Sequence, residues 1–319
     1  MISKKERYKA LCEHEKSIPI FSQPWWLDSV AGEDDWDVCL VERGGQTIAS
    51  MPYVIKNRIG FKLCSMPTLT QTLGPWIRPS AAKYAKQLAQ QKELMNQLIQ
   101  QLPDFDYFLQ NWHYSQTNWL PFYWKGFKQS NSYTYVIEDL SDLGKIWSGF
   151  RENIRRDIRK ASNRFNLLIN DSLSVTDFLE LNKRVFDRQN KHPPYSEEFV
   201  HKLDRSCIEN SSRKIFIAID EDGRKHAGVY IIWDKDSAYY LMGGGDPELR
   251  NSGATSLCMW EAIKFASTVV NKFDFEGSMI EPVERFFQAF GAKQQSYCTI
   301  TKTPSMLLRI RSAALSLSD

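Results

Sequence analysis

Two acidic residues stand in a stretch that otherwise has the pattern of a short buried strand. The stretch FDFEGSMIEPVERFFQAFGA runs from residue 273 to 292 and carries Asp274 and Glu276. Because side chains alternate along a strand, both carboxylates are expected on one face. A shared, partly desolvated site raises a carboxyl pKa and suits general-base chemistry. We therefore expect Glu276, at the mouth of the strand, to act as a base, and Asp274 to orient an amine or support Glu276.

A structural role for these residues is the alternative. Asp274 would cap a turn through Ser278, while Glu276 would pair with Arg285. Glu281 and Glu284, near the start of the following helix, are expected to favour its dipole.

A second candidate site is the glycine-rich segment YYLMGGGDPELRNSGATSL, in which a strand ends in three glycines and a polar loop leads into a helix. A glycine at a helix start lets phosphate oxygens approach the backbone N–H groups, and the helix dipole favours the anion. An arginine three residues before the glycine would add a charge-assisted contact. The candidate pyrophosphate site comprises Arg250, Ser252, Gly253, Ala254 and Thr255. An ordinary glycine-rich turn is the alternative.

Most of the chain's basic character lies in one predicted helix. Residues 145–164 hold seven cationic and two acidic side chains, whereas the whole chain has a net charge of only +3. The remainder is therefore slightly acidic, which argues against a general DNA-binding surface. The helix would hold a phosphate-bearing acceptor in a cleft between two domains, through Arg151, Asn153, Arg155 or Arg156. A solvated helix face is the alternative.

Aromatic and histidine residues supply two further candidates. The segment NWHYSQTNWLPFYWKGF, residues 111–127, is dense in aromatic rings, and Trp112 is a candidate contact for a sugar ring. Packing in a core is the alternative for this cluster. His192 lies in the loop KHPPYS, which two prolines would stiffen over a site, and it is a candidate base or substrate contact. The histidines and cysteines show no metal-ligand spacing, so no metal is expected.

The candidate residues belong to a pattern of predicted strands and helices that occurs twice in the sequence. Residues 38–63 and 216–245 both have the pattern of three antiparallel strands joined by tight turns, and an offset of 178 residues superposes small residues of the two middle strands. Any two meanders can look alike, which is the alternative to a repeat. Each meander is followed by an amphipathic helix, near residues 82–101 and 253–269, and then by a strand.

The repeat predicts two α/β (α+β) domains, each with a mixed, mostly antiparallel sheet flanked by helices. We expect an N-terminal domain over residues 1–140 and a C-terminal domain over 141–319, opened by Ser141 or Asp142 as the N-cap of the basic helix. A chain of 319 residues is long enough for two cores. No stretch is apolar enough to cross a bilayer, and the six cysteines lie far apart, so we expect a reduced, cytoplasmic protein.

The set of motifs resembles a known family. R-N-S-G-A after a strand is similar to the acyl-CoA pyrophosphate loop of the GNAT acyltransferases, and the repeated unit looks like the tandem GNAT fold of the FemAB family. FSQPWWLDSV, NIRRDIRKA and FDFEGS followed by FGA agree with that family in type and order. The family often has F-K-x-x-F-G near its end, whereas Phe287 stands at the lysine position here.

The resemblance implies an N-acyltransferase that uses acetyl-CoA or another acyl-CoA. The reacting carbonyl would lie beside the strand from Tyr239 to Gly243, which adds Tyr239 to the catalytic candidates. The implied acceptor is an amine on a phosphate-bearing molecule, such as an amino-sugar nucleotide or a lipid-linked cell-envelope precursor, as in polysaccharide biosynthesis. A FemAB-type transfer from aminoacyl-tRNA to a peptidoglycan precursor is the first alternative, and a non-catalytic binding module is the second. GxSxG, GxxxxGK[ST] and HExxH are absent, so hydrolase and kinase functions find no support.

Overall fold

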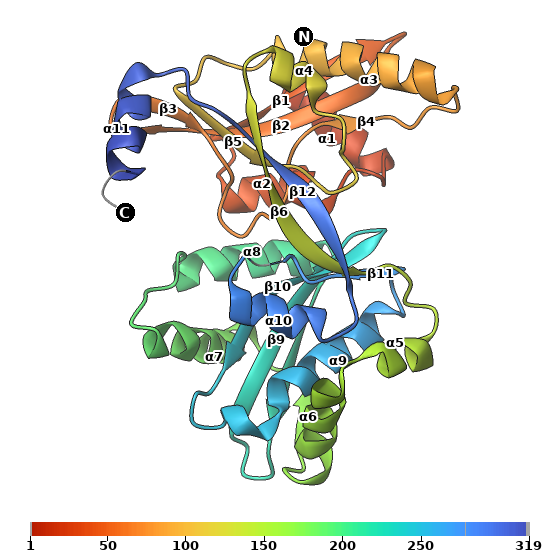
Figure 1. Cartoon of the computed structure of the whole chain (residues 1–319), viewed down its shortest axis with the longest axis vertical. Coiled ribbons are helices and arrows are strands. Elements are labelled where there is room, and N and C mark those ends of the chain that lie inside the picture. Colours follow the sequence, from red (N-terminus) through yellow and green to blue (C-terminus); the bar gives the residue numbers. More distant parts are fainter. Residues whose placement is uncertain (1, 278, 317–319) are drawn as a thin grey trace. The chain divides into compact units, whose positions relative to one another are not determined.

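The computed structural model describes residues 2–277 and 279–316, with side chains up to Arg311. The chain divides into two compact units, Met1–Ser132 with Ser296–Asp319, and Tyr133–Gln295. These bounds differ from the expected division at residue 140, because two strands, β6 (Lys128–Ile137) and β12 (Lys293–Lys302), each run from one unit into the other. The end of the chain thereby belongs to the first unit (Figure 1).

The first unit is a sheet covered on both faces. Its strands follow the order β1-β2-β3-β5-β12, with β4 paired to β2, and β3–β5 is the parallel pair. Val38 and Leu40 of β1 pack with α1 and α2, while Cys39 and Val41 pack with α3, as the two-residue period of a strand requires. Besides β6 and β12, the elements are α1 (Lys4–His14), η1 (Ile20–Ser22), α2 (Pro24–Val30), β1 (Trp36–Arg43), β2 (Gln46–Arg58), β3 (Phe61–Cys64), β4 (Trp76–Ile77), α3 (Tyr84–Ile99), β5 (Tyr107–Asn111), α4 (Leu120–Trp124) and α11 (Met306–Ser316).

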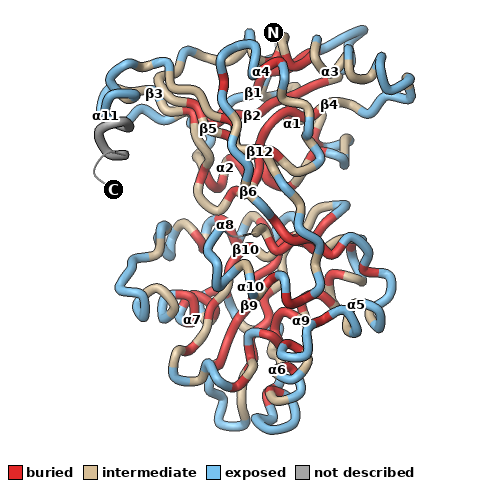
Figure 2. Tube along the Cα trace, in the orientation of Figure 1, coloured by how far each residue is buried: buried red, intermediate tan, exposed pale blue. Residues whose placement is uncertain are grey.

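The second unit has the strand order β6-β11-β10-β9-β8-β7, in which only β10 and β11 are parallel among the described pairs. Ala227, Val229 and Ile231 of β9 join a core with α6 and α9, whereas Gly228 and Tyr230 face α7. Figure 2 shows the buried stretches along the strands and α9 of this unit. The elements are α5 (Leu143–Gly149), α6 (Glu152–Asn163), β7 (Leu168–Asn170), α7 (Val175–Arg188), α8 (Glu197–Glu209), β8 (Arg213–Ile219), β9 (Lys225–Trp233), β10 (Ser237–Gly245), η2 (Arg250–Ser252), α9 (Ala254–Ala266), β11 (Lys272–Asp274) and α10 (Glu281–Gln288).

Both predicted meanders are confirmed, as β1–β2–β3 and β8–β9–β10. Their turns use glycines with positive φ, 75° at Gly45 and 76° at Gly223. The fold class is confirmed too, because each sheet is mostly antiparallel and flanked by helices.

The basic helix begins later than the sequence predicted. Asp142 does cap a helix, accepting a hydrogen bond from the Lys145 N–H, but that helix is α5 and it ends at Gly149. The basic residues lie on α6, whose N-cap is Arg151. The break falls at Phe150, whose buried ring packs edge to face on Trp260 and Phe290. Tertiary packing of one aromatic ring thus divides a stretch that reads locally as one helix.

Candidate functional site

Strands β10 and β11 pair for only three residues and then part. The parallel pairing ends at Tyr239 and Asp274, whereas β10 continues to Gly245. A bulge interrupts the register of β10 with β9 between Tyr240 and Met242. Such bulges redirect the residues of a strand and often lie beside functional sites. Beyond Tyr239, β10 therefore has β9 on one side and no continuation of β11 on the other.

The register of β10 with β9 determines which way the last backbone N–H and C=O groups of β10 point. The Asp246 N–H donates to the His226 carbonyl at 2.9 Å, which makes the facing residues Gly245 and Ala227 a pair without direct hydrogen bonds. The facing residues Gly243 and Val229, two positions earlier on β10, are likewise a pair without direct hydrogen bonds. The N–H and C=O of Gly243 consequently point away from β9, toward the side that β11 has left.

A buried asparagine engages this edge from α7. The Asn182 side-chain amide donates to the Gly243 carbonyl at 2.7 Å and its oxygen accepts from the Tyr195 hydroxyl at 3.0 Å. Gly244 lies so close to α7 that a β-carbon there would be 2.7 Å from the Asn182 backbone nitrogen. The glycines of this segment therefore permit close packing.

Asp274 is a buried carboxylate at the end of β11. Its side chain accepts hydrogen bonds from the Thr134 hydroxyl and, at 2.8 Å, from the Glu276 N–H. Burial raises the pKa of Asp274 to about 6, against the opposing effect of these two hydrogen bonds. A carboxyl group with this pKa changes its charge just below neutral pH.

Glu276 lies beyond the end of β11, not on it. Its φ is +58°, in the left-handed region, so the alternation that was expected to place it on the face of Asp274 is broken. Burial raises the pKa of Glu276 well above its ordinary value, and the negative charge of Asp274 raises it further. Asp274 and Glu276 therefore lie close together, as predicted. They do so because the chain turns after β11, and not because side chains alternate along a strand.

One half of the structural alternative, the pairing of Glu276 with Arg285, is wrong, and the other half is not tested. Arg285 forms its ion pair with Glu281, one helical turn earlier, and not with Glu276. Glu281 and Glu284 do lie in the first turn of α10, as expected. Ser278 lies outside the described residues.

The two neighbouring tyrosines of β10 point in different directions. The Tyr239 hydroxyl donates to Asp234, in the β9–β10 turn, at 3.1 Å, and its catalytic role stays a prediction. Tyr240 was not predicted. Its ring packs edge to face on Phe287, with centroids 5.7 Å apart, and a β-carbon on Gly243 would collide with its hydroxyl. Burial raises the Tyr240 pKa, so the hydroxyl keeps its proton at neutral pH.

The predicted phosphate loop enters α9 through Gly253, which has a φ of +84° and provides no side-chain cap. Arg250 and Thr255 are exposed, whereas Ser252 and Ala254 are buried. The Ala254 N–H is 3.4 Å from the Ser252 hydroxyl oxygen. A β-carbon on Gly253 would collide with the Asp157 carbonyl of α6, so packing alone requires a glycine here. The phosphate-binding role of this loop stays a prediction.

Helix α6 packs against this same loop, and part of its charge is neutralised. Arg155 pairs with Glu152 at 2.8 Å, and Arg151 donates to Gln288 at 2.9 Å. Asn153 and Arg156 are exposed, and no carboxylate among the described residues engages Arg156. The acceptor role of these four residues, and the cleft in which it was expected, stay predictions.

The two remaining candidates differ in exposure. Trp112 is fully buried and packs edge to face on Phe122 at 4.7 Å between centroids. A ligand contact for Trp112 is therefore not supported, because the ring is part of the first unit's core. His192 is exposed in the loop between α7 and α8, the loop from which Tyr195 reaches Asn182.

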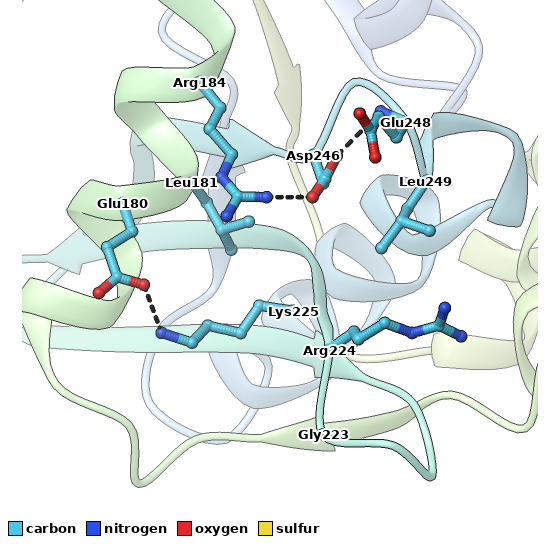
Figure 3. A pocket seen from close by; sticks show the side chains of 9 residues that line it. All are labelled: Glu180, Leu181, Arg184, Gly223, Arg224, Lys225, Asp246, Glu248 and Leu249. Carbon is cyan, nitrogen blue, oxygen red and sulfur yellow. Dashed lines mark hydrogen bonds and ion pairs between the residues drawn. The ribbon is translucent and has the colours of Figure 1, made fainter.

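A polar pocket of about 360 Å³ adjoins the loop that follows β10 (Figure 3). Its lining residues are Glu180, Leu181, Arg184, Gly223, Arg224, Lys225, Asp246, Glu248 and Leu249. The three cations are all engaged: Arg184 by Asp246, Lys225 by Glu180 at 2.6 Å, and Arg224 by Asp220 at 2.7 Å. The cations of this pocket are thus neutralised by neighbouring carboxylates. The ion pair between Arg184 and Asp246 links the loop to α7.

Comparison with known proteins agrees with this geometry. Residues 148–280 match the family model described as an acetyltransferase (GNAT) domain. This segment is thus similar to a GNAT domain. It includes α6, the glycine loop, Asp274 and Glu276. No curated protein sequence matches the chain.

Solved structures extend the likeness to the whole chain. FemX superposes with a TM-score of 0.66 at 12% identity, over 93% of this chain and 96% of that one. The C-terminal domain of a protein assigned as a lysylphosphatidylglycerol synthetase from Agrobacterium fabrum gives 0.54 at 11% identity, over 98% and 97%. A tandem GNAT protein from the clavulanic acid biosynthesis pathway gives 0.51 at 11% identity, over 94% of each chain. The chain has the fold of the FemAB-like tandem GNAT proteins, as its motifs indicated.

The described residues include no candidate for a membrane-spanning helix or for a metal site. None of their helices combines the length and the apolar character that a bilayer crossing requires. They contain no group of three or more histidine, cysteine or acidic side chains placed to hold a metal ion.

Proposed function

We propose that the chain is an acyltransferase that moves an acyl group from acyl-CoA to an amine. The observation that carries the proposal is the divergence of β10 and β11, which leaves an open, bulged strand edge beside two carboxyl groups of raised pKa. Raised carboxyl pKa values beside an opening in a sheet are typical of sites for proton transfer.

The donor would lie along the edge of β10. The pantetheine arm of an acyl-CoA contains amides, which can pair with the outward-pointing N–H of Gly243, whose carbonyl already accepts from Asn182. Its diphosphate would then meet the start of α9, where the N-cap residue, Gly253, supplies no side-chain cap. Arg250 is exposed at this point, and no carboxylate among the described residues pairs with it.

The chemistry requires one proton acceptor and one proton donor. The neutral amine attacks the thioester carbonyl, and the new C–N bond forms as backbone N–H groups of β10 stabilise the oxyanion. The amine proton passes to the pair formed by Asp274 and Glu276, in which the charge of Asp274 raises the pKa of Glu276. The C–S bond then breaks as the leaving thiolate takes a proton from the Tyr240 hydroxyl, and the tyrosinate regains a proton from solvent while the carboxyl pair releases the amine proton.

The acceptor proposed is an amine on a phosphate-bearing molecule, such as an amino-sugar nucleotide or a lipid-linked cell-envelope precursor. The support for this class is the excess of cations on α6, of which Arg156 is exposed and unengaged by any described carboxylate. Asn153, one turn earlier, would add a hydrogen bond to the same group.

Binding and turnover test the donor and the chemistry separately. Acetyl-CoA should raise the thermal midpoint of the purified protein, in proportion to its occupancy. Arg250→Ala should weaken acetyl-CoA binding about tenfold, as expected for loss of a charge-assisted hydrogen bond. Arg164→Ala, an exposed cation at the far end of α6, is the matched control and should bind as the wild type does. Absence of any response to CoA or acetyl-CoA would contradict the proposal.

Transfer is then measured with nucleotide-linked amino sugars as acceptors. Glu276→Gln and Asp274→Asn should lower the transfer rate by about 10²–10⁴ while acetyl-CoA still binds. If both variants keep the wild-type rate, these carboxylates are not the proton acceptor.

A FemAB-type reaction is the second candidate, favoured by the superposition on FemX. It predicts transfer from charged tRNA and no stabilisation by acetyl-CoA. Phe287, at the position where that family often has lysine, favours the acyl-CoA donor. A non-catalytic module predicts that the carboxylate variants change stability alone.

A further inference from the structure

Ile59 stands at the tip of the β2–β3 hairpin in a conformation that its side chain disfavours. Its φ is +51°, and Gly60 follows with a φ of +77°. A two-residue turn with both φ values positive favours Asn-Gly, and a β-branched residue in the left-handed region is an outlier. Ile59 is nevertheless 81% exposed. The turn therefore holds an apolar side chain out in solvent at a cost in backbone energy.

Helix α11 exposes a second set of apolar side chains. Met306, Leu307 and Ile310 are 70%, 69% and 57% exposed. Their spacing of one and three residues places them on one side of the helix. Scattered exposed apolar residues are ordinary, whereas three on one helical face are a candidate interaction surface.

Asp106 joins the hairpin to the start of this helix. Its carbonyl accepts from the Ser305 N–H at 3.4 Å, one residue before α11. Its N–H donates to the Lys62 carbonyl, and its carboxylate accepts from the Lys62 N–H, both at 2.9 Å. Lys62 lies two residues beyond Gly60, so the hairpin tip and α11 are neighbours within the first unit (Figure 1).

Cations flank both sets of apolar side chains. Residues 56–62 contain Lys56, Arg58 and Lys62, and residues 302–311 contain Lys302, Arg309 and Arg311, with no acidic residue in either segment. Five of the six are exposed, whereas Lys302 is half-buried and its amine donates to the Lys125 carbonyl at 2.7 Å. No carboxylate among the described residues forms an ion pair with any of them. Against a net charge of only +3 for the chain, this is a strongly basic surface.

We propose that the surface formed by Ile59, Met306, Leu307, Ile310 and the five exposed cations binds the anionic face of a lipid bilayer. Protruding apolar side chains enter the boundary between headgroups and acyl chains, and flanking lysine and arginine side chains are drawn to anionic headgroups. The charge is complementary to such a surface, and the apolar groups project from a turn and a short helix. The proposal does not depend on the acyltransferase activity.

Vesicle binding tests the proposal on the full chain. The protein should co-sediment with vesicles of phosphatidylcholine and phosphatidylglycerol, bind pure phosphatidylcholine at least tenfold less, and be released by high salt. Ile59→Asn should weaken vesicle binding about tenfold by removing one inserted side chain. Asparagine tolerates the left-handed conformation, so this variant should keep or raise the thermal midpoint.

Two further variants make the assignment specific. Leu307→Gln, on the exposed face of α11, should weaken binding as Ile59→Asn does. Leu168→Gln, 71% exposed in the second unit, is the matched control and should leave binding unchanged. Equal binding to neutral vesicles, or an equal loss in the control, would overturn the proposal. So would failure to bind vesicles together with self-association that Ile59→Asn abolishes, because the surface would then join copies of the chain.

Discussion

Replacing Asp274 with asparagine measures how strongly the fold disfavours a buried charge at this site. Burial raises the Asp274 pKa from 3.8 to about 6. Between these values the folded protein binds more protons than the unfolded chain, so the free energy of unfolding falls as pH rises. One pKa unit corresponds to about 1.4 kcal/mol, so the ionised carboxylate costs roughly 3 kcal/mol at neutral pH. The stability is therefore fully present below about pH 4 and is lost as pH rises through about 6.

Asparagine removes the charge and keeps an oxygen that can accept from the Thr134 hydroxyl and the Glu276 N–H. We expect Asp274→Asn to match the wild type at pH 4.5 and to exceed it at pH 7.5 by about 2 kcal/mol, after about 1 kcal/mol is allowed for the new amide donors. For a unit of this size that is roughly 4–8 °C in the thermal midpoint.

Thermal melts at matched ionic strength from pH 4.5 to 8 provide the measurement, with both proteins compared at each pH so that other titrating groups cancel. Asp236→Asn is the control, since Asp236 is exposed and pairs with Lys272 at 2.8 Å. It should change stability by about 1 kcal/mol at most, with no step between pH 4 and 6. If the difference between Asp274→Asn and the wild type is the same at pH 4.5 and 7.5, Asp274 is not desolvated and the reasoning fails.

Three further substitutions, with Gly245→Ala as a control for the first, test the packing behind the site by chemical denaturation. Gly244→Ala should cost about 1–3 kcal/mol because the new methyl lies 2.7 Å from the Asn182 backbone nitrogen, whereas Gly245→Ala, with 3.7 Å to its nearest neighbour, should cost less than about 1 kcal/mol. Asn182→Leu should cost about 1–3 kcal/mol because it deprives a strand carbonyl and a tyrosine hydroxyl of their partner. Asp204→Ala should cost about 3–5 kcal/mol because it leaves the largely buried Arg213, now paired at 2.8 Å, without its counter-charge. Effects below about 0.5 kcal/mol in these three would contradict the contacts described.

The meanders and the helices that follow them could be predicted because their signals are local. Turn glycines such as Gly45 and Gly223 and the two-residue alternation of the strands need no knowledge of tertiary contacts. The division of the basic helix at Phe150 could not be predicted, because it depends on rings far away in the sequence.

The candidate site was predicted only in part, because only some of its residues have a local signal in the sequence. Asp274 could be predicted as a candidate from the sequence alone, because it is an acidic residue in an otherwise apolar strand. Asn182 is one polar residue among many on an amphipathic helix, and only the fold brings it to the Gly243 carbonyl. Tyr240 could have been found, because a large ring pointing along a strand explains why glycines must follow it.

The residues that separate β10 from β11 also include those proposed to carry the chemistry. Glu276 and Gly277 both have positive φ, and a β-carbon on Gly277 would collide with the Tyr133 carbonyl, so the chain leaves the sheet at a fixed point. A non-glycine residue in the left-handed region costs energy, and so does a buried carboxylate. Asparagine at position 274 would accept the same two hydrogen bonds without the charge. The left-handed backbone of Glu276 and the buried carboxylate of Asp274 both lower the stability of the fold at one point of the sheet. Because neither is needed for stability, we favour proton transfer as the role of this carboxylate.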